Sequence, residues 1–115
     1  MRRDCQRLLD IIDALNWVAK AVEGRTEDQF TSDEMLRYAV ARQLIIVGEA
    51  AARLSPELIQ KHPSIPWADI VGLRNILVHE YFGVHWPLVW QTVCDDVPLL
   101  LAQVREILRL EFPEQ

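Results

Sequence analysis

Apolar residues recur three and four positions apart through most of this chain, which is the spacing of one face of an α-helix. Such stripes occupy residues 3–22, 31–54, 67–81 and about 87–108, and Gly24 ends the first of them. We find no strand-type alternation, internal repeat or low-complexity segment between the stripes. The pattern therefore predicts an all-α fold, a four-helix bundle with up-down connections and short links.

The second stripe carries the clearest start signal and a patch of small residues. Thr31 and Glu34 have the spacing of a capping box, in which each side chain binds the other's free backbone N–H group. Gly48 and the alanines at 50–52 would let another backbone approach this helix closely. Residues 23–29, before the stripe, are polar and are predicted to be a link.

Prolines mark the other boundaries. Three prolines lie in residues 56–66, which predicts a loop with at most one helical turn at 57–61. Pro98 lies inside the fourth stripe. It is expected to kink the C-terminal helix, or to make it restart with Asp95 or Asp96 as a cap.

The third stripe contains an arginine where a leucine would be expected. At about 100° per residue, one arc of this helix holds five apolar side chains, Ile70, Val71, Leu77, Val78 and Tyr81. Arg74 falls in the middle of that arc, and Asn75 and His79 share its flank. Because a guanidinium stays protonated, an arginine on a buried stripe needs a paired anion or a partly wet interface. Glu49 is a candidate anion, and a solvated glutamate is the alternative.

Composition and charge narrow the function classes. With 115 residues, half of them hydrophobic, the chain suits a single domain over residues 1–115. A net charge of −5 argues against coating nucleic acid through bulk electrostatics, so we expect no DNA partner, although a local basic pocket for RNA is compatible with it. Neither a signal peptide nor a membrane span is predicted, which favours a cytoplasmic protein without a membrane partner.

Most strong catalytic signals are missing. There is no Gly-rich phosphate loop, no Cys or His pair at zinc spacing and no Gly-x-Ser-x-Gly turn, so neither a metal site nor a cofactor is predicted. Arg74, Asn75, His79 and Tyr81 remain. They fit a structural arginine, a surface histidine and a core tyrosine. They also fit metal-free phosphodiester chemistry, with imidazole as the base and guanidinium on the phosphate, or nucleotide binding without chemistry.

Helix geometry adds a condition to the catalytic interpretation. Arg74 and His79 lie about 140° apart around an ideal helix, so one copy presents them awkwardly to a single phosphate. Two copies with these helices adjacent would direct both side chains into a common cleft. The catalytic interpretation therefore predicts a two-fold homodimer.

Arg74, His79 and Tyr81 together form the pattern Arg-x4-His-x-Tyr, followed by Phe82 and Gly83. In this pattern the chain resembles the HepT-like branch of the HEPN superfamily, small all-α ribonuclease toxins paired with a MntA-type nucleotidyltransferase antitoxin. The likeness extends to residues 46–50, 65–67, 81–84 and 90–98. It therefore covers nearly the whole chain and is more specific than the short motif.

The resemblance implies a metal-independent, homodimeric endoribonuclease of a HepT/MntA-type (type VII) toxin–antitoxin system. On that pattern Arg74 and His79 cleave RNA through attack by the 2′-hydroxyl, leaving a cyclic phosphate, and Asn75 supports them. Glu49 is expected to support them as the candidate anion for Arg74. Tyr81 matches the tyrosine to which the partner attaches AMP. An added nucleotide brings bulk and negative charge to the cleft, where it would block RNA and occupy Arg74.

Two histidines stand apart from this pattern. Relatives commonly carry Asp where this chain has His85, and His is a poor cap for the helix that follows. His62 lies in the proline-rich loop and is expected to be solvated. Two alternatives to the nuclease remain, a non-catalytic HEPN module that binds a nucleotide or protein partner, and a purely structural dimerising bundle.

Overall fold

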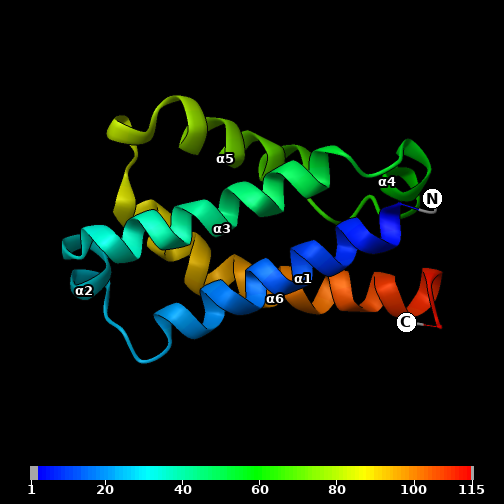
Figure 1. The fold of residues 1–115 in the computed structure, drawn as a ribbon, viewed down its shortest axis with the longest axis horizontal. Coiled ribbons are helices and arrows are strands. Elements are labelled where there is room, and N and C mark those ends of the chain that lie inside the picture. Colours follow the sequence, from blue (N-terminus) through cyan, green and yellow to red (C-terminus); the bar gives the residue numbers. More distant parts are fainter. Residues whose placement is uncertain (1–2, 115) are drawn as a thin grey trace.

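The computed structural model describes residues 3–114, and within them the chain forms helices and no strands. The long helices are α1 (Asp4–Val22), α3 (Glu34–Ala52), α5 (Trp67–His79) and α6 (Trp86–Glu111), each antiparallel to the one before it (Figure 1). The short helices α2 (Glu27–Ser32) and α4 (Pro56–Lys61) and the 3-10 turn η1 (Tyr81–Gly83) lie at the ends of the bundle. The predicted all-α, up-down architecture is confirmed.

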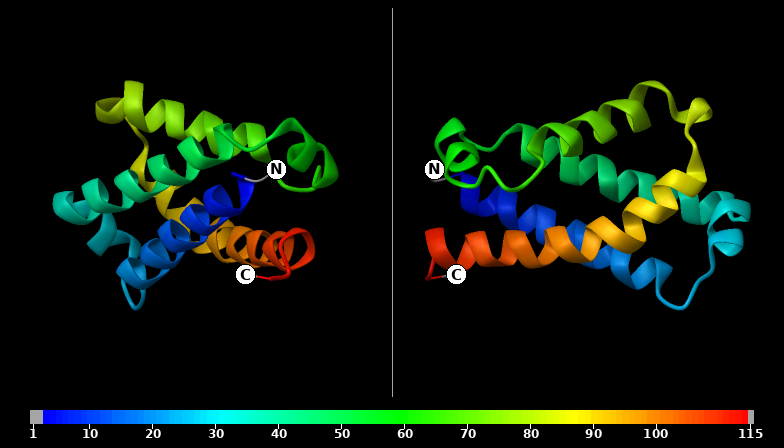
Figure 2. Two further views of the ribbon diagram at one scale, coloured as in Figure 1. Left: turned by 45° about the vertical axis from the view of Figure 1, so that its right-hand side comes forward. Right: turned by 180° about the vertical axis from the view of Figure 1, so that it is seen from behind.

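The hydrophobic core lies between α1, α3 and α6. Each of these helices buries the apolar stripe that its sequence predicts, with Leu8, Ile11, Leu15 and Val18 on α1, Val40, Leu44 and Val47 on α3, and Val93, Val97 and Val104 on α6. Helix α1 packs on both α3 and α6, whereas α5 packs mainly on α3 and lies on the outside of the bundle (Figures 1 and 2). The third stripe of the sequence is therefore covered on one side only.

The capping box lies at another threonine than the sequence predicted. Thr26 Oγ1 accepts from the backbone N–H of Gln29, and Gln29 Oε1 accepts from the backbone N–H of Thr26, so α2 begins inside the supposed polar link. The predicted box at Thr31 is wrong. Asp33 caps α3 by accepting from the N–H of Leu36, because the chain turns there and its backbone is extended.

The prolines shape the chain in three ways. Pro56 opens the six-residue helix α4, which is longer than the single turn predicted at 57–61, and the Ser55 side chain caps it. Pro98 neither stops α6 nor makes it restart at Asp95 or Asp96. The helix runs on continuously, and its N-terminal part lies at an angle to the rest (Figure 2).

Helix α5 ends two residues earlier than predicted. Glu80 leaves the helical region at φ −131°, although its N–H still bonds to the carbonyl of Ile76 at 2.8 Å. The chain then tightens, so Tyr81 lies in η1 rather than in α5. The predicted apolar arc is also only partly correct, because Val78 is 42% exposed and points away from the core.

None of the helices in the described part of the chain combines the length and apolar composition needed to cross a membrane.

Candidate active site

Helices α3 and α5 lie close together at Gly48. A Cβ built on this glycine would overlap the Cβ of Arg74 and would lie 2.8 Å from its Cγ. It would also lie 3.2 Å from the backbone oxygen of Ile70. The absence of a side chain at Gly48 is therefore what makes room for the stem of Arg74, which agrees with the close approach expected at this small-residue patch.

Arg74 is held by two neighbours. Its Nη2 lies 3.6 Å from Oε1 of Glu49, and its Nη1 donates to Oδ1 of Asn75 at 2.9 Å. The ion pair predicted between Arg74 and Glu49 is therefore present. The Arg74 side chain is 29% exposed and its Nε is buried without a hydrogen-bond partner in the described part of the chain. The guanidinium is thus oriented by the protein and still reachable from solvent.

His79 lies apart from this cluster. It is the last residue of α5, its side chain is exposed, and no hydrogen bond joins it to Arg74 among residues 3–114. Asn75 is also exposed, on the outer side of the helix. No hydrogen bond therefore joins Arg74 and His79 within residues 3–114, and their awkward presentation to a single phosphate by one copy stays a prediction.

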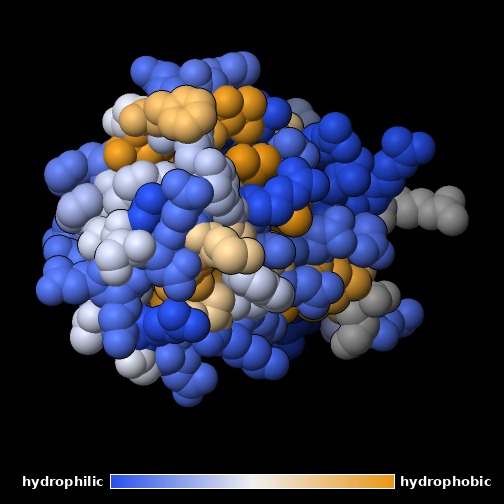
Figure 3. Space-filling view, turned by 60° about the vertical axis from the view of Figure 1, so that its left-hand side comes forward, coloured by the Kyte–Doolittle hydropathy of each residue, from blue (hydrophilic) through white to orange (hydrophobic). Residues whose placement is uncertain are grey.

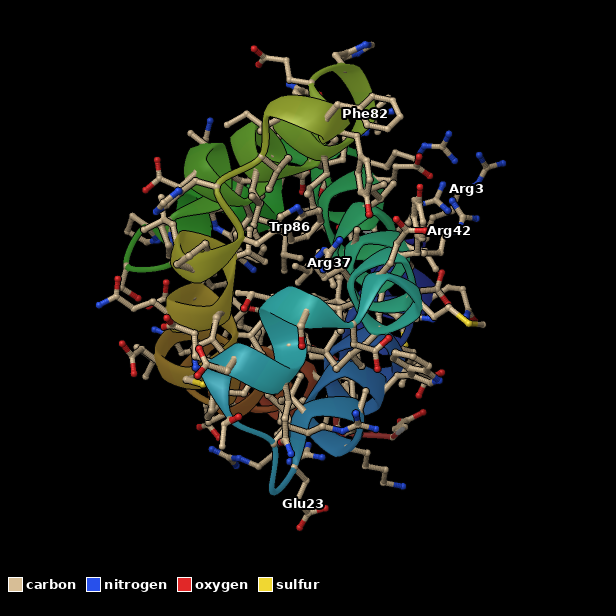
Figure 4. All side chains as sticks on the ribbon, turned by 90° about the vertical axis from the view of Figure 1, so that its left-hand side faces the viewer. Arg3, Glu23, Arg37, Arg42, Phe82 and Trp86 are labelled. Carbon is tan, nitrogen blue, oxygen red and sulfur yellow. The ribbon has the colours of Figure 1, made fainter. Side chains whose placement is uncertain are left out.

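Tyr81 lies among aromatic side chains. Its ring is stacked on that of Tyr38 from α3, with centroids 5.1 Å apart and planes 6° from parallel. Trp86 and Phe82 contact it edge-on, at 5.2 Å and 5.7 Å. Arg37 lies over the Trp86 ring, 5.5 Å from its centroid, and Figure 4 shows both between α3 and the start of α6.

Burial is the main cause that raises the pKa of the Tyr81 phenol, and the nearby Tyr38 and Glu34 add to it, while Arg37 acts the other way. The phenol therefore stays protonated at neutral pH. Any reaction at its oxygen requires a base to remove that proton.

Sequence reasoning missed Tyr38, Arg37 and Trp86. Tyr38 lies beside the apolar stripe of α3, and nothing in its spacing marks a contact with a residue 43 positions later. The one available signal was an aromatic residue at a position that the helical pattern leaves exposed.

The remaining histidines lie elsewhere. The prediction that His62 is solvated is wrong, because its side chain is only 17% exposed and its Nε2 lies 3.2 Å from Oε1 of Glu111. His85 is the N-cap residue of α6 and makes no side-chain capping hydrogen bond, as expected for histidine. Within residues 3–114, no group of three His, Cys, Asp or Glu side chains is placed to hold a metal ion.

The fold and the site together define the class of this protein as an all-α bundle with an arginine and a histidine five residues apart on one helix. The comparison with protein families narrows this class. The family model described as "Ribonuclease HepT-like" matches residues 11–107, and the chain belongs to that family.

Individual relatives agree with this assignment. The chain is 39% identical to "Putative RNase MJ1380" of Methanocaldococcus jannaschii over 90% of its own length and 95% of that protein. It is also 39% identical to "Putative RNase TTE0752" of Caldanaerobacter subterraneus, covering 88% and 90% of the two chains. It is 32% identical to "Probable ribonuclease HepT" of Thermococcus cleftensis, covering 87% and 91%. No solved structure matches this chain significantly.

Proposed function

We propose that this chain is a metal-independent endoribonuclease and the toxin of a HepT/MntA-type toxin–antitoxin system. The observation that carries the proposal is the state of Arg74. Its guanidinium is anchored by Glu49 and Asn75 but remains partly exposed, and His79 is exposed at the end of the same helix. Membership of a ribonuclease family supports RNA as the substrate.

The chemistry assigns one role to each side chain. The neutral imidazole of His79 takes the proton from a ribose 2′-hydroxyl, whose oxygen then forms a bond to the adjacent phosphorus. The bond from phosphorus to the 5′-oxygen of the next nucleotide breaks, and that oxygen takes up a proton. Arg74 binds the phosphate and the charge that develops on its oxygens. The products are a 2′,3′-cyclic phosphate and a 5′-hydroxyl.

The outer face of α5 supports a homodimer. Ala68, Asn75, Ile76 and His79 are exposed along it, and Gly72 is partly exposed between them. Beside them runs an open groove of about 590 Å³ that also borders Ala51 and Ala52. Small residues let two helices approach closely, so a second copy packed on this face would direct His79 of one chain toward Arg74 of the other.

Tyr81 is the proposed site of control. A MntA-type nucleotidyltransferase would remove the phenolic proton, and the oxygen would attack the α-phosphorus of ATP with loss of pyrophosphate. The attached AMP adds a phosphate and a nucleoside beside α5. It would compete with RNA for Arg74 and would block the cleft of the dimer.

The nuclease proposal is tested by His79→Ala, assayed on single-stranded RNA with a chelator present. We expect cleavage to fall by at least about 10²-fold, the usual contribution of a positioned general base. His85→Ala is the matched control, because it removes another exposed histidine outside the motif. Equal cleavage by the His79→Ala protein would contradict the proposal, and RNA or nucleotide binding without any cleavage would favour the non-catalytic module.

The control proposal is tested by intact mass after co-expression with the MntA-type partner. The chain has two tyrosines, Tyr38 and Tyr81, so two variants assign the site. We expect the mass of one or more AMP groups on the parent and on Tyr38→Phe, and none on Tyr81→Phe. A Tyr81→Phe protein that still gains AMP would place the modification on another residue.

A further inference from the structure

Tyr38 presents an aromatic ring beside the proposed active site. One face of this ring is stacked on Tyr81, and the residue is 47% exposed. Phe82, at the far edge of Tyr81, is 95% exposed and stands out from the end of the molecule (Figure 4). Apolar surface also gathers at the top of the face in Figure 3, where α5 and η1 lie. A row of rings therefore continues from the bundle to the surface.

The charges around this row suit a nucleotide better than an apolar partner. Arg37 lies one residue before Tyr38 on α3 and holds Trp86, while Arg42, one turn later, is exposed. Glu34, one turn before Tyr38, is the acidic group on that side and acts against an anion. Stacking of a base on an aromatic ring tolerates this mixed charge, because it needs the face of the ring rather than a phosphate contact.

The distance from Arg74 also fits a substrate strand. Arg74 contacts α3 at Gly48, and Tyr81, further along the chain, contacts α3 at the earlier residue Tyr38. Helices α3 and α5 therefore run antiparallel. Ten residues of helix separate Gly48 from Tyr38, which is about 15 Å at 1.5 Å per residue. A single RNA strand crosses that distance in a few nucleotides, and His79 lies between Arg74 and Tyr81 in the sequence.

We propose that the ring of Tyr38 is a stacking site for a base of the RNA substrate, a few nucleotides from the cleaved phosphate. This inference rests on the proposed ribonuclease function and adds to it a residue outside the motif. The stacked Tyr81 holds the Tyr38 ring in place, so the site is preorganised and a base adds one more layer to an existing stack. AMP attached to Tyr81 would then disturb this site as well as Arg74.

The test measures binding of a labelled, short single-stranded RNA to the His79→Ala protein, which allows affinity to be read without cleavage. In that protein, Tyr38→Leu keeps apolar bulk against Tyr81 but removes the ring, and Tyr38→Phe keeps the ring. We expect Tyr38→Leu to weaken binding by about 5- to 150-fold, the range for loss of one stacked base, and Tyr38→Phe to bind within about 2-fold of the parent. Trp17→Leu is the control, because Trp17 is a similarly exposed aromatic residue on α1.

A second measurement separates stacking from a merely structural role. A set of RNAs is prepared in which each member lacks the base of one nucleotide. We expect that one of these RNAs binds the protein that keeps Tyr38 as weakly as the complete RNA binds the Tyr38→Leu variant. Combining that RNA with the Tyr38→Leu variant should cause no further loss of affinity. Losses that add at every position would overturn the stacking site.

The remaining outcomes also decide the question. Equal binding by the Tyr38→Leu protein and its parent overturns the inference, and so does an equal loss in Trp17→Leu. If the parent protein binds RNA without cleaving it while the Tyr38 effect is present, the ribonuclease proposal fails and base stacking stands. If His79 is required and Tyr38 has no effect, only the stacking site fails.

Discussion

Helices α1 and α5 belong to the same bundle but use their apolar residues differently. On α1 the stripe Leu8, Ile11, Leu15 and Val18 is at most 1% exposed, and the helix is packed between α3 and α6. On α5 only Trp67 and Leu77 are buried, while Ile76 and Val78 are 45% and 42% exposed. Arg74 and His79 therefore lie on the long helix that contributes the fewest buried residues to the core.

This difference explains why Arg74 is tolerated on an apolar stripe. On α1, an arginine in the middle of the stripe would be surrounded by α3 and α6 and would lose its hydration. On α5 the guanidinium emerges at the edge of one helix–helix contact, where Glu49 and Asn75 receive it and water still reaches it. A helix covered on one side can hold a charged group in a fixed orientation at low cost.

The largest expected effect on stability is the difference between truncating an apolar side chain on α1 and truncating one on α5. Leu15→Ala on α1 removes a side chain that is 1% exposed, and we expect a loss of about 2–5 kcal/mol in the free energy of unfolding. Ile76→Ala on α5 should change it by less than about 0.5 kcal/mol, because this side chain is 45% exposed. Chemical denaturation of both variants at low protein concentration measures the difference. Similar losses would show that α5 is as much a core helix as α1.

Alanine substitutions at the two glycines near Arg74, Gly48 and Gly72, should change the stability of the protein in opposite directions. Gly48→Ala places a methyl group against the stem of Arg74, and we expect a loss of about 1–3 kcal/mol together with displacement of the guanidinium. A Cβ at position 72 would have no atom within 4 Å, so the higher helix propensity of alanine in Gly72→Ala should stabilise α5 by about 0.5–1 kcal/mol. Thermal unfolding compares the pair. A harmless Gly48→Ala would mean that α3 and α5 do not pack as closely as described.

A smaller effect is expected at the opposite end of the bundle, between α4 and α6. Burial raises the pKa of the Glu111 carboxyl, but hydrogen bonds from His62 and Lys61 outweigh it and leave the pKa below its ordinary value. A carboxyl whose pKa is lowered by folding stabilises the protein above its unfolded pKa, about 4.3, and this stabilisation is lost as the pH falls through the folded pKa.

Glu111→Gln should therefore lower the melting temperature slightly at pH 7 and leave it unchanged at strongly acidic pH. Glu114→Gln is the control, because Glu114 is exposed and this substitution removes the same charge nearby. Melting curves of the three proteins across this pH range provide the measurement. A difference that persists at the acidic end would mean that the Glu111 carboxylate is not the source of the effect. Cleavage should not change, because this end of the bundle lies away from the motif.

The amino-acid sequence by itself determined the four long helices, because each carries an apolar stripe whose period is visible within a single segment. It also determined that Arg74 needs a paired anion or a partly wet interface, since a guanidinium stays protonated in any surroundings. Glu49 could be named as a candidate because the small residues around Gly48 indicated which helix would approach. These inferences needed only local spacing and the chemistry of individual side chains.

Only the tertiary structure decided which of several equivalent local choices was made. Thr26 and Thr31 both have capping chemistry, and the turn of the chain before α3 selected Thr26. Tyr81 was counted on the apolar arc of the third helix, but the end of α5 at His79 moved it into a stack with Tyr38. Contacts between distant segments depend on how the helices pack, and no periodicity within one helix records them. For that reason the motif on α5 was visible in the sequence, whereas the aromatic row beside it appeared only in the fold.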